Sequence, residues 1–209
     1  MTVALDGIAG ASGEAVLRAR IEALPRIDLG VSTTPLVHLP RLSAALGGPR
    51  IHIKRDDLAG GPQGGNKTRM LEFVLAKATA EGADTVVGGS AVQSNYSRQL
   101  AAACARMGLD CHLVLRKVRG SRDERIEGSL LLDLLYGAHV QFVEDDRGLQ
   151  LERQLGLGGQ LSAEGRRVYY APIASDVDKP LHAVAYAAAA LELLDQLRTA
   201  RIDLSLIHI

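Results

Sequence analysis

The sequence has few cysteines, no excess of either charge and no long apolar run, and each shortage excludes a class of protein. Cys104 and Cys111 are too few for a disulfide framework or a cysteine-based zinc site, and the six histidines are scattered along the 209 residues. Basic and acidic side chains number 24 each. This balance disfavours nucleic acid and anionic membranes as partners, because both attract proteins with a basic excess.

No apolar run approaches the roughly 20 residues that a membrane-spanning helix requires. The first 20 residues carry acids and lack a basic stretch before a long apolar segment, so they do not resemble a signal peptide. Apolar residues nevertheless make up 47% of the chain, enough for a buried core. We expect a folded, soluble, cytoplasmic protein with no membrane partner.

From Thr68 onward, helix-like and strand-like segments alternate. The helical patterns cover residues 68–82, 95–108, 125–138 and part of 148–165, and the strand patterns cover 84–89, 111–116, 139–144 and 166–173. Such alternation is typical of βαβ units, in which helices cover both faces of a parallel sheet. The pattern therefore predicts an α/β fold with three layers.

The flanking regions are less regular. Residues 14–24 and 181–198 have helical patterns, and residues 50–54 form a short strand pattern after a proline-punctuated stretch. A further strand pattern starts in the final segment, RIDLSLIHI.

The segment GGPQGGNKTRMLEF, residues 60–73, places Lys67 between a glycine-rich stretch and a helix. A phosphate-binding loop of the P-loop type requires glycine directly before the lysine, but Asn66 occupies that position. The preceding IHIKRDDLAG is also too charged for the buried strand that a P-loop follows. The nucleotide-phosphate interpretation is therefore disfavoured.

Covalent chemistry suits Lys67 better. Free N–H groups and the positive end of the helix dipole disfavour an ammonium at a helix start, and so favour an amine that attacks an aldehyde. Gly64 and Gly65 have no side chains, so a flat ring could approach their backbone. Two alternatives remain: an ordinary solvated lysine, or Lys54 as the reactive amine, although Lys54 has no adjacent glycine.

A second loop, GGSAVQSN, follows the predicted strand at 84–89 and precedes a helix. Ligands of parallel sheets bind at this carboxyl edge. Ser94 and Asn95 are favourable N-cap residues, and the free N–H groups behind them suit a substrate carboxylate. An ordinary N-cap without a ligand is the alternative.

Together, IKRDDLAGGPQGGNKTRMLEF and ADTVVGGSAVQSNYSRQLAAACARMGL resemble the N-terminal half of a family of pyridoxal-phosphate enzymes. This family includes D-cysteine desulfhydrase and 1-aminocyclopropane-1-carboxylate deaminase, and it has the tryptophan-synthase-β-like fold, fold type II. The upstream TTPLVHLPRLSAALGG is similar to the opening of the same family. The resemblance extends from about Leu24 to Leu115.

The resemblance implies a role for each matching residue. Lys67 would be the Schiff-base lysine for pyridoxal 5'-phosphate, and Asn66 would support the cofactor. Asn95 would hydrogen-bond the oxygen on the cofactor ring, and Ser94 would lie beside the substrate and assist catalysis. Tyr96 stands where relatives carry histidine or glutamine, and its side chain would face the substrate.

The resemblance also implies a division of the chain. Residues 1–68 and 173–209 would belong to an incomplete larger domain, and residues 69–172 would form the smaller domain. The family's phosphate-binding loop and a catalytic tyrosine are expected beyond Ile209, and LSLIHI resembles translated adapter sequence. IAS at 173–175 replaces a glycine-serine turn. We expect the chain itself to be an inactive fragment of an enzyme that is a homodimer in its full-length form.

The function implied is removal of a leaving group from a small amino acid, releasing a 2-oxo acid and ammonia. D-Cysteine is the first candidate substrate, and cyclopropane ring-opening deamination is the second. A non-catalytic α/β ligand-binding module is the alternative of another class. No metal site is expected, because Asp56 and Asp57 fit a turn cap with ion pairing better than a metal pair.

Overall fold

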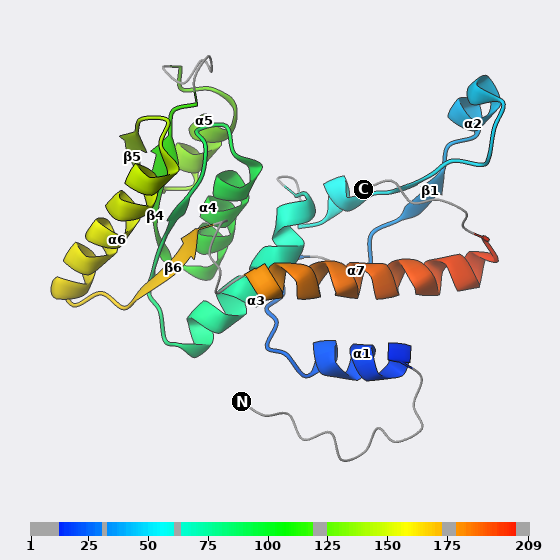
Figure 1. Ribbon diagram of the computed structural model, residues 1–209, viewed down its shortest axis with the longest axis horizontal. Helices are drawn as coiled ribbons and strands as arrows, with labels where there is room; N and C mark the ends of the chain where they lie inside the picture. The colour runs from blue at the N-terminus through cyan, green and yellow to red at the C-terminus, as the bar shows by residue number, and fades with distance from the viewer. Residues whose placement is uncertain (1–12, 31–32, 61–63, 119–124, 173–178, 204–209) are drawn as a thin grey trace.

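The computed structural model in Figure 1 describes residues 13–30, 33–60, 64–118, 125–172 and 179–203. The sheet region consists of α3 (Asn66–Ala80), β3 (Thr85–Gly89), α4 (Asn95–Met107), β4 (Asp110–Arg116), α5 (Gly128–Leu135), β5 (His139–Val143), α6 (Arg147–Ala163) and β6 (Val168–Pro172). The flanking elements are α1 (Gly13–Glu22), β1 (Leu36–His38), α2 (Pro40–Leu46), β2 (His52–Lys54), the short 3-10 helix η1 (Asp56–Leu58) and α7 (Lys179–Ala200).

The four long strands form one parallel sheet in the order β5-β4-β3-β6. α4 and α5 cover one face, and α6 covers the other (Figure 1). Every residue of β3 is buried, as expected for a central parallel strand with helices on both sides. The predicted α/β fold with a three-layer parallel sheet is confirmed.

The end of β3 depends on two glycines. A Cβ at Gly88 would lie 2.7 Å from Cδ2 of Leu100 and 2.8 Å from the carbonyl oxygen of Ala171. Gly89 has a φ of 130°, and a Cβ there would lie 2.2 Å from the carbonyl oxygen of Val114. Only glycine fits this close backbone approach, so the sequence GG sets where the chain leaves the sheet.

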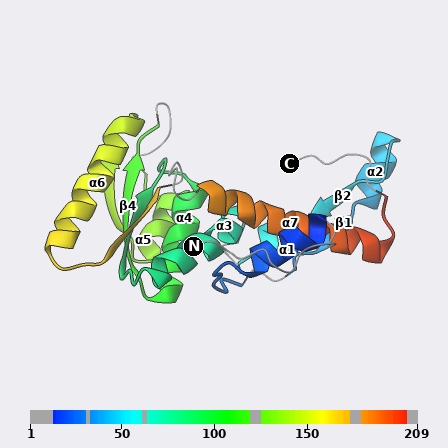
Figure 2. The ribbon, with the colours of Figure 1, turned by 60° about the horizontal axis from the view of Figure 1, so that its bottom comes forward.

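The flanks form an extension beside the sheet (Figure 2). α7 packs against α3 and α1. β1 and β2 pair antiparallel, with α2 between them. The sequence pattern predicted β2 but missed β1 and α2, which lie in the proline-punctuated stretch before it.

Other predicted boundaries were close. α3 begins at Asn66, two residues before the predicted start, and Gly82 follows its C-cap with a φ of 75°. Residues 201–203 are not in a strand, and residues 173–175 and 204–209 lie outside the described residues. No described helix is long and apolar enough to cross a membrane.

Asp133 places a carboxyl group in the core between α4, α5 and the sheet. Asp133 of α5 is fully buried, and within the described ranges neither of its oxygens has a hydrogen-bond partner. Burial raises the pKa of Asp133 to about 7 from an ordinary value of 3.8, although Arg98 opposes the shift. The ionised form of Asp133 therefore destabilises the fold.

We expect Asp133→Asn to stabilise the protein at about pH 8. The gap between 3.8 and about 7 corresponds to at most about 4 kcal/mol of unfolding free energy. Because the pKa is raised by folding, the parent's stability should fall as pH rises from about 4 to 7, and the variant's should not. Urea unfolding across this pH range, with exposed Asp203→Asn as control, measures the difference. Parallel pH profiles for parent and Asp133→Asn would contradict the assignment.

Candidate active site

Lys67 lies in the first turn of α3, directly after the glycine loop. Gly65 is the N-cap, with a φ of 147°, and its N–H donates to the carbonyl oxygen of Ala59 over 3.0 Å. A Cβ at Gly65 would lie 2.9 Å from Nε2 of Gln99. The absence of a side chain thus lets α3 start close against α4.

Gln99 of α4 holds this start of α3 in place. Its Oε1 accepts hydrogen bonds from the backbone N–H of Thr68 over 2.8 Å and from the Thr68 hydroxyl over 3.0 Å. Gln99 is 4% exposed, so both bonds are shielded from water. The first turns of the two helices are therefore tied together, close to the carboxyl edge of β3.

The loop before α4 forms the second part of the site. Oγ of Ser94 accepts hydrogen bonds from the backbone N–H groups of Tyr96 over 3.1 Å and of Ser97 over 3.4 Å. The predicted N-cap at Ser94 is confirmed. Asn95 follows as an exposed residue at the first helical position.

The same loop is fixed to α5 through Gln93. Its Oε1 accepts from the backbone N–H of Ser129 over 2.9 Å, and its Nε2 donates to the carbonyl oxygen of Glu127 over 3.1 Å. Sequence reasoning missed this anchor, since nothing in the pattern joins positions 93 and 129. The loop that carries Ser94 and Asn95 is thus held from two sides.

Asn66 and Tyr96 face neighbouring elements. Asn66 lies beside Tyr186 of α7, and burial raises the pKa of Tyr186 although Asn66 opposes the shift. Tyr96 is 1% exposed, its hydroxyl donates to the carbonyl oxygen of Ala171 over 3.1 Å, and its ring meets His182 edge-on at 6.2 Å. In this chain Tyr96 is therefore a core residue behind the loop, instead of part of an open surface.

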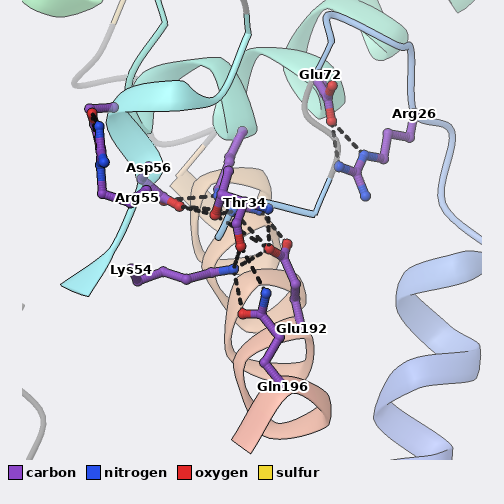
Figure 3. Close-up of polar contacts among 10 residues, drawn as sticks. Arg26, Thr34, Lys54, Arg55, Asp56, Glu72, Glu192 and Gln196 are labelled. Carbon is purple, nitrogen blue, oxygen red and sulfur yellow. Dashed lines mark hydrogen bonds and ion pairs between the residues drawn. The ribbon is translucent and has the colours of Figure 1, made fainter. Parts of the chain in front are cut away.

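Lys54, the competing reactive lysine, is bound in an ion-pair network (Figure 3). Its Nζ pairs with Glu192 of α7 and donates to Oε1 of Gln196 over 2.7 Å and to the carbonyl oxygen of Thr34 over 2.6 Å. Three acceptors therefore hold the Lys54 side chain in the network. In contrast, no side chain in the described part of the chain pairs with Lys67. Of the two candidate lysines, Lys54 is thus the one with a carboxylate partner among the described residues.

Arg69 joins the same network from α3. This guanidinium is 3% exposed, and it contacts Asp56 over 2.8 and 2.9 Å and Glu192 over 2.9 Å. Burial alone would raise the pKa of Glu192, but the bonds from Arg69 and Lys54 lower it below its ordinary value. The ion-pairing expectation for Asp56 is confirmed.

Asp57, the other half of the suspected metal pair, is also in an ion pair. It binds Arg55 over 2.7 Å on the surface, away from the buried network of Asp56. The two neighbouring carboxylates thus bind different arginines.

The sequence comparison defines the class of protein. Residues 27–207 match the family described as pyridoxal-phosphate dependent enzyme. The chain belongs to this family, and its fold is the type II, tryptophan-synthase-β-like fold, as the two motifs predicted.

The chain is similar to individual members of this family. D-Cysteine desulfhydrase of Serratia proteamaculans is 38% identical over 191 residues, which cover 90% of this chain and 57% of that protein. The Klebsiella pneumoniae protein of the same name is 40% identical over 176 residues, which cover 82% of this chain and 52% of that protein. A crystal structure described as an ACC deaminase homologue matches with a TM-score of 0.76 and 33% identity, covering 86% and 53%. The chain spans about half the length of these relatives.

We expect Glu192→Gln to lower the unfolding free energy by about 3–5 kcal/mol, because Arg69 and Lys54 would lose a buried counter-charge. Asp57→Asn removes a carboxylate from the exposed pair and is the matched control, for which we expect little change. Urea unfolding of both variants tests the expectation. Equal losses of unfolding free energy in the two variants would show that burial of the network does not increase its contribution to stability.

Proposed function

We propose that this chain is part of a pyridoxal-phosphate dependent lyase that removes a leaving group from a small amino acid and releases a 2-oxo acid and ammonia. D-Cysteine is the first candidate substrate, after the names of the most similar relatives. One observation carries the proposal: the two candidate lysines differ in their partners. Lys54 is in an ion pair, whereas Lys67, at the start of α3, has no such partner among the described residues. A cytoplasmic location and a homodimer in the full-length form belong to the same proposal.

The residues present fit pyridoxal 5'-phosphate. Lys67 offers an amine with no competing carboxylate in the described ranges, and the start of α3 that carries it is packed against Gln99 at Gly65. Asn66 and Asn95 are exposed amides at the starts of α3 and α4. We propose that Lys67 carries the cofactor and that Asn66 and Asn95 hold its ring. When bound, the cofactor takes up the negative charge that develops on the substrate carbon.

The protein's own contribution is positioning and proton transfer. Lys67 would take the proton from the substrate Cα and return it, because its amine is held on a rigid helical turn. Ser94 Oγ already accepts two backbone N–H groups, so its own O–H is the group left to donate toward a substrate carboxylate. The backbone N–H of Asn95, which Ser94 Oγ does not cap, would bind the same carboxylate together with the Asn95 side chain.

Tyr96 stays in the proposal with an altered role. Its hydroxyl binds the carbonyl of Ala171 at the end of β6, so we propose that it shapes the substrate side of the site through that strand. Ring-opening deamination of 1-aminocyclopropane-1-carboxylate is the second candidate activity, favoured by the structural neighbour described as an ACC deaminase homologue. A non-catalytic ligand-binding module is the alternative of another class, and it predicts no covalent cofactor.

The first test maps the lysine. The 209-residue chain is incubated with excess pyridoxal 5'-phosphate, reduced with borohydride and digested, and the labelled peptide is identified by mass spectrometry. We expect the label on Lys67, and we expect Lys67→Ala to remove it. Lys54→Arg is the control and should leave the label in place. A label on Lys54, or an even distribution over surface lysines, would refute the assignment.

The second test separates the structural and chemical roles of Ser94. Ser94→Ala removes both the cap and the hydroxyl, so it should cost about 1 kcal/mol of unfolding free energy and most of the turnover. Ser94→Asn keeps a capping oxygen and should restore stability without restoring turnover. Urea unfolding and keto-acid release, the latter in a protein of the relatives' full length, are the measurements. Normal turnover in Ser94→Asn would limit Ser94 to capping.

A further inference from the structure

A cluster of three metal-binding side chains lies at the amino edge of the sheet. Asp110 and His112 open β4, and His139 is the first residue of β5. The loop with Ser94 follows the carboxyl end of β3, and β3, β4 and β5 are parallel. The cluster is therefore at the opposite edge of the sheet from the proposed catalytic residues, which do not account for it.

Strand register brings the three side chains together. His112 and His139 are direct partners in the β4–β5 ladder, and Asp110 precedes His112 by two residues. Because side chains alternate along a strand, all three project from the same face, while Cys111 projects from the other. The two imidazole rings stack with centroids 4.5 Å apart and planes 20° apart. The β4–β5 register thus places two imidazoles and one carboxylate next to one another on the same face of the sheet.

The distances match a metal coordination shell. Nε2 of His139 lies 3.1 Å from Oδ1 of Asp110, and Nε2 of His112 lies 3.4 Å from Oδ2. All three ligand atoms lie within 4.8 Å of one another. Zinc bonds of about 2.0–2.2 Å in a tetrahedron separate neighbouring ligand atoms by roughly 3.3 Å. Small side-chain adjustments would therefore complete three corners of a zinc site.

His112 also has an unused ligand atom. Its Nε2 is buried and makes no hydrogen bond within the described residues. Buried polar nitrogens normally have a partner, which a bound ion would provide here.

Arg166 is a neighbour that opposes a cation. Its Nη2 contacts Oδ2 of Asp110 over 2.9 Å, whereas Oδ1 faces His139. Arg166 has other anchors, since its Nε donates to the Thr85 hydroxyl over 2.8 Å and lies 3.4 Å from Asp84. Arg166 can therefore keep its place while Asp110 turns Oδ1 toward an ion.

We propose that Asp110, His112 and His139 bind one divalent transition-metal ion, with zinc as the class representative. Two imidazoles and a carboxylate suit such an ion, and they disfavour calcium and magnesium, which prefer oxygen ligands alone. His139 is 62% exposed, so the site is open to solvent and water completes the coordination. The bound ion links β5, the edge strand of the sheet, to β4.

Isothermal titration of the metal-free 209-residue chain with zinc chloride tests this proposal. We expect one equivalent to bind, and zinc at about 100 times the dissociation constant should raise Tm by about 5 °C. Loss of an outer-shell partner alone weakens metal sites about 10- to 100-fold, so His139→Ala and Asp110→Asn should each weaken binding by at least about tenfold. The exposure of His139 makes its substitution compatible with folding.

The chain contains a matched control. His38 and His52 are also direct cross-strand partners, with ring centroids 5.0 Å apart, but the described residues supply no carboxylate to them. His52→Ala should leave the tight equivalent unchanged, and magnesium chloride should give no binding. Absence of zinc binding at about 100 μM, or binding that His139→Ala does not weaken, would refute the site.

Discussion

The arrangement of the chain depends on one buried charge, the guanidinium of Arg69. A charge that is 3% exposed is tolerated only when opposite charges and hydrogen-bond acceptors surround it. Asp56 and Glu192 supply them, and Lys54 balances the second negative charge. Two segments far apart in sequence must therefore meet at α3: the strand β2 with the adjoining η1, and the middle of α7. Their positions are coupled, because withdrawing one leaves an unbalanced charge for the others.

This constraint also fixes the backbone that carries Lys67. The residues on either side of it are occupied: Asn66 with α7, Thr68 with α4, and Arg69 with the ion network. One turn later, Glu72 accepts from the backbone N–H of Leu29. Glu72 also accepts from Arg26 (Figure 3). The backbone of the first turns of α3 is thus fixed on several sides. Preorganisation of this kind suits the proton-transfer role that we propose for Lys67.

The sheet was predictable from the sequence because its signals are local. Buried strands such as TVVGG are short β-branched runs that end at glycines, and Gly108 closes α4 with a φ of 70°. The ion network was not predictable, since Lys54 and Glu192 are 138 residues apart and each looks like an ordinary surface charge. The three-residue β1 gave no usable alternation. The histidines seemed scattered because only the β4–β5 register pairs His112 with His139.

The direction of the parallel strands relates the proposed catalytic residues to the proposed metal site. At the carboxyl edge of a parallel sheet, helices begin, so free N–H groups and the positive ends of the helix dipoles favour anions. Ser94 and the start of α4 belong to this edge.

At the amino edge the preceding helices end: α4 at Met107, shortly before Asp110, and α5 at Leu135, shortly before His139. Free carbonyls and the negative ends of the dipoles favour cations there. Those carbonyls are largely taken up by the turns into the next strand, as in the bonds from Gly108 and Ala138 back to their helices. Side chains must then supply the ligands at the amino edge, and imidazoles beside a carboxylate are the groups that the β4–β5 register places there.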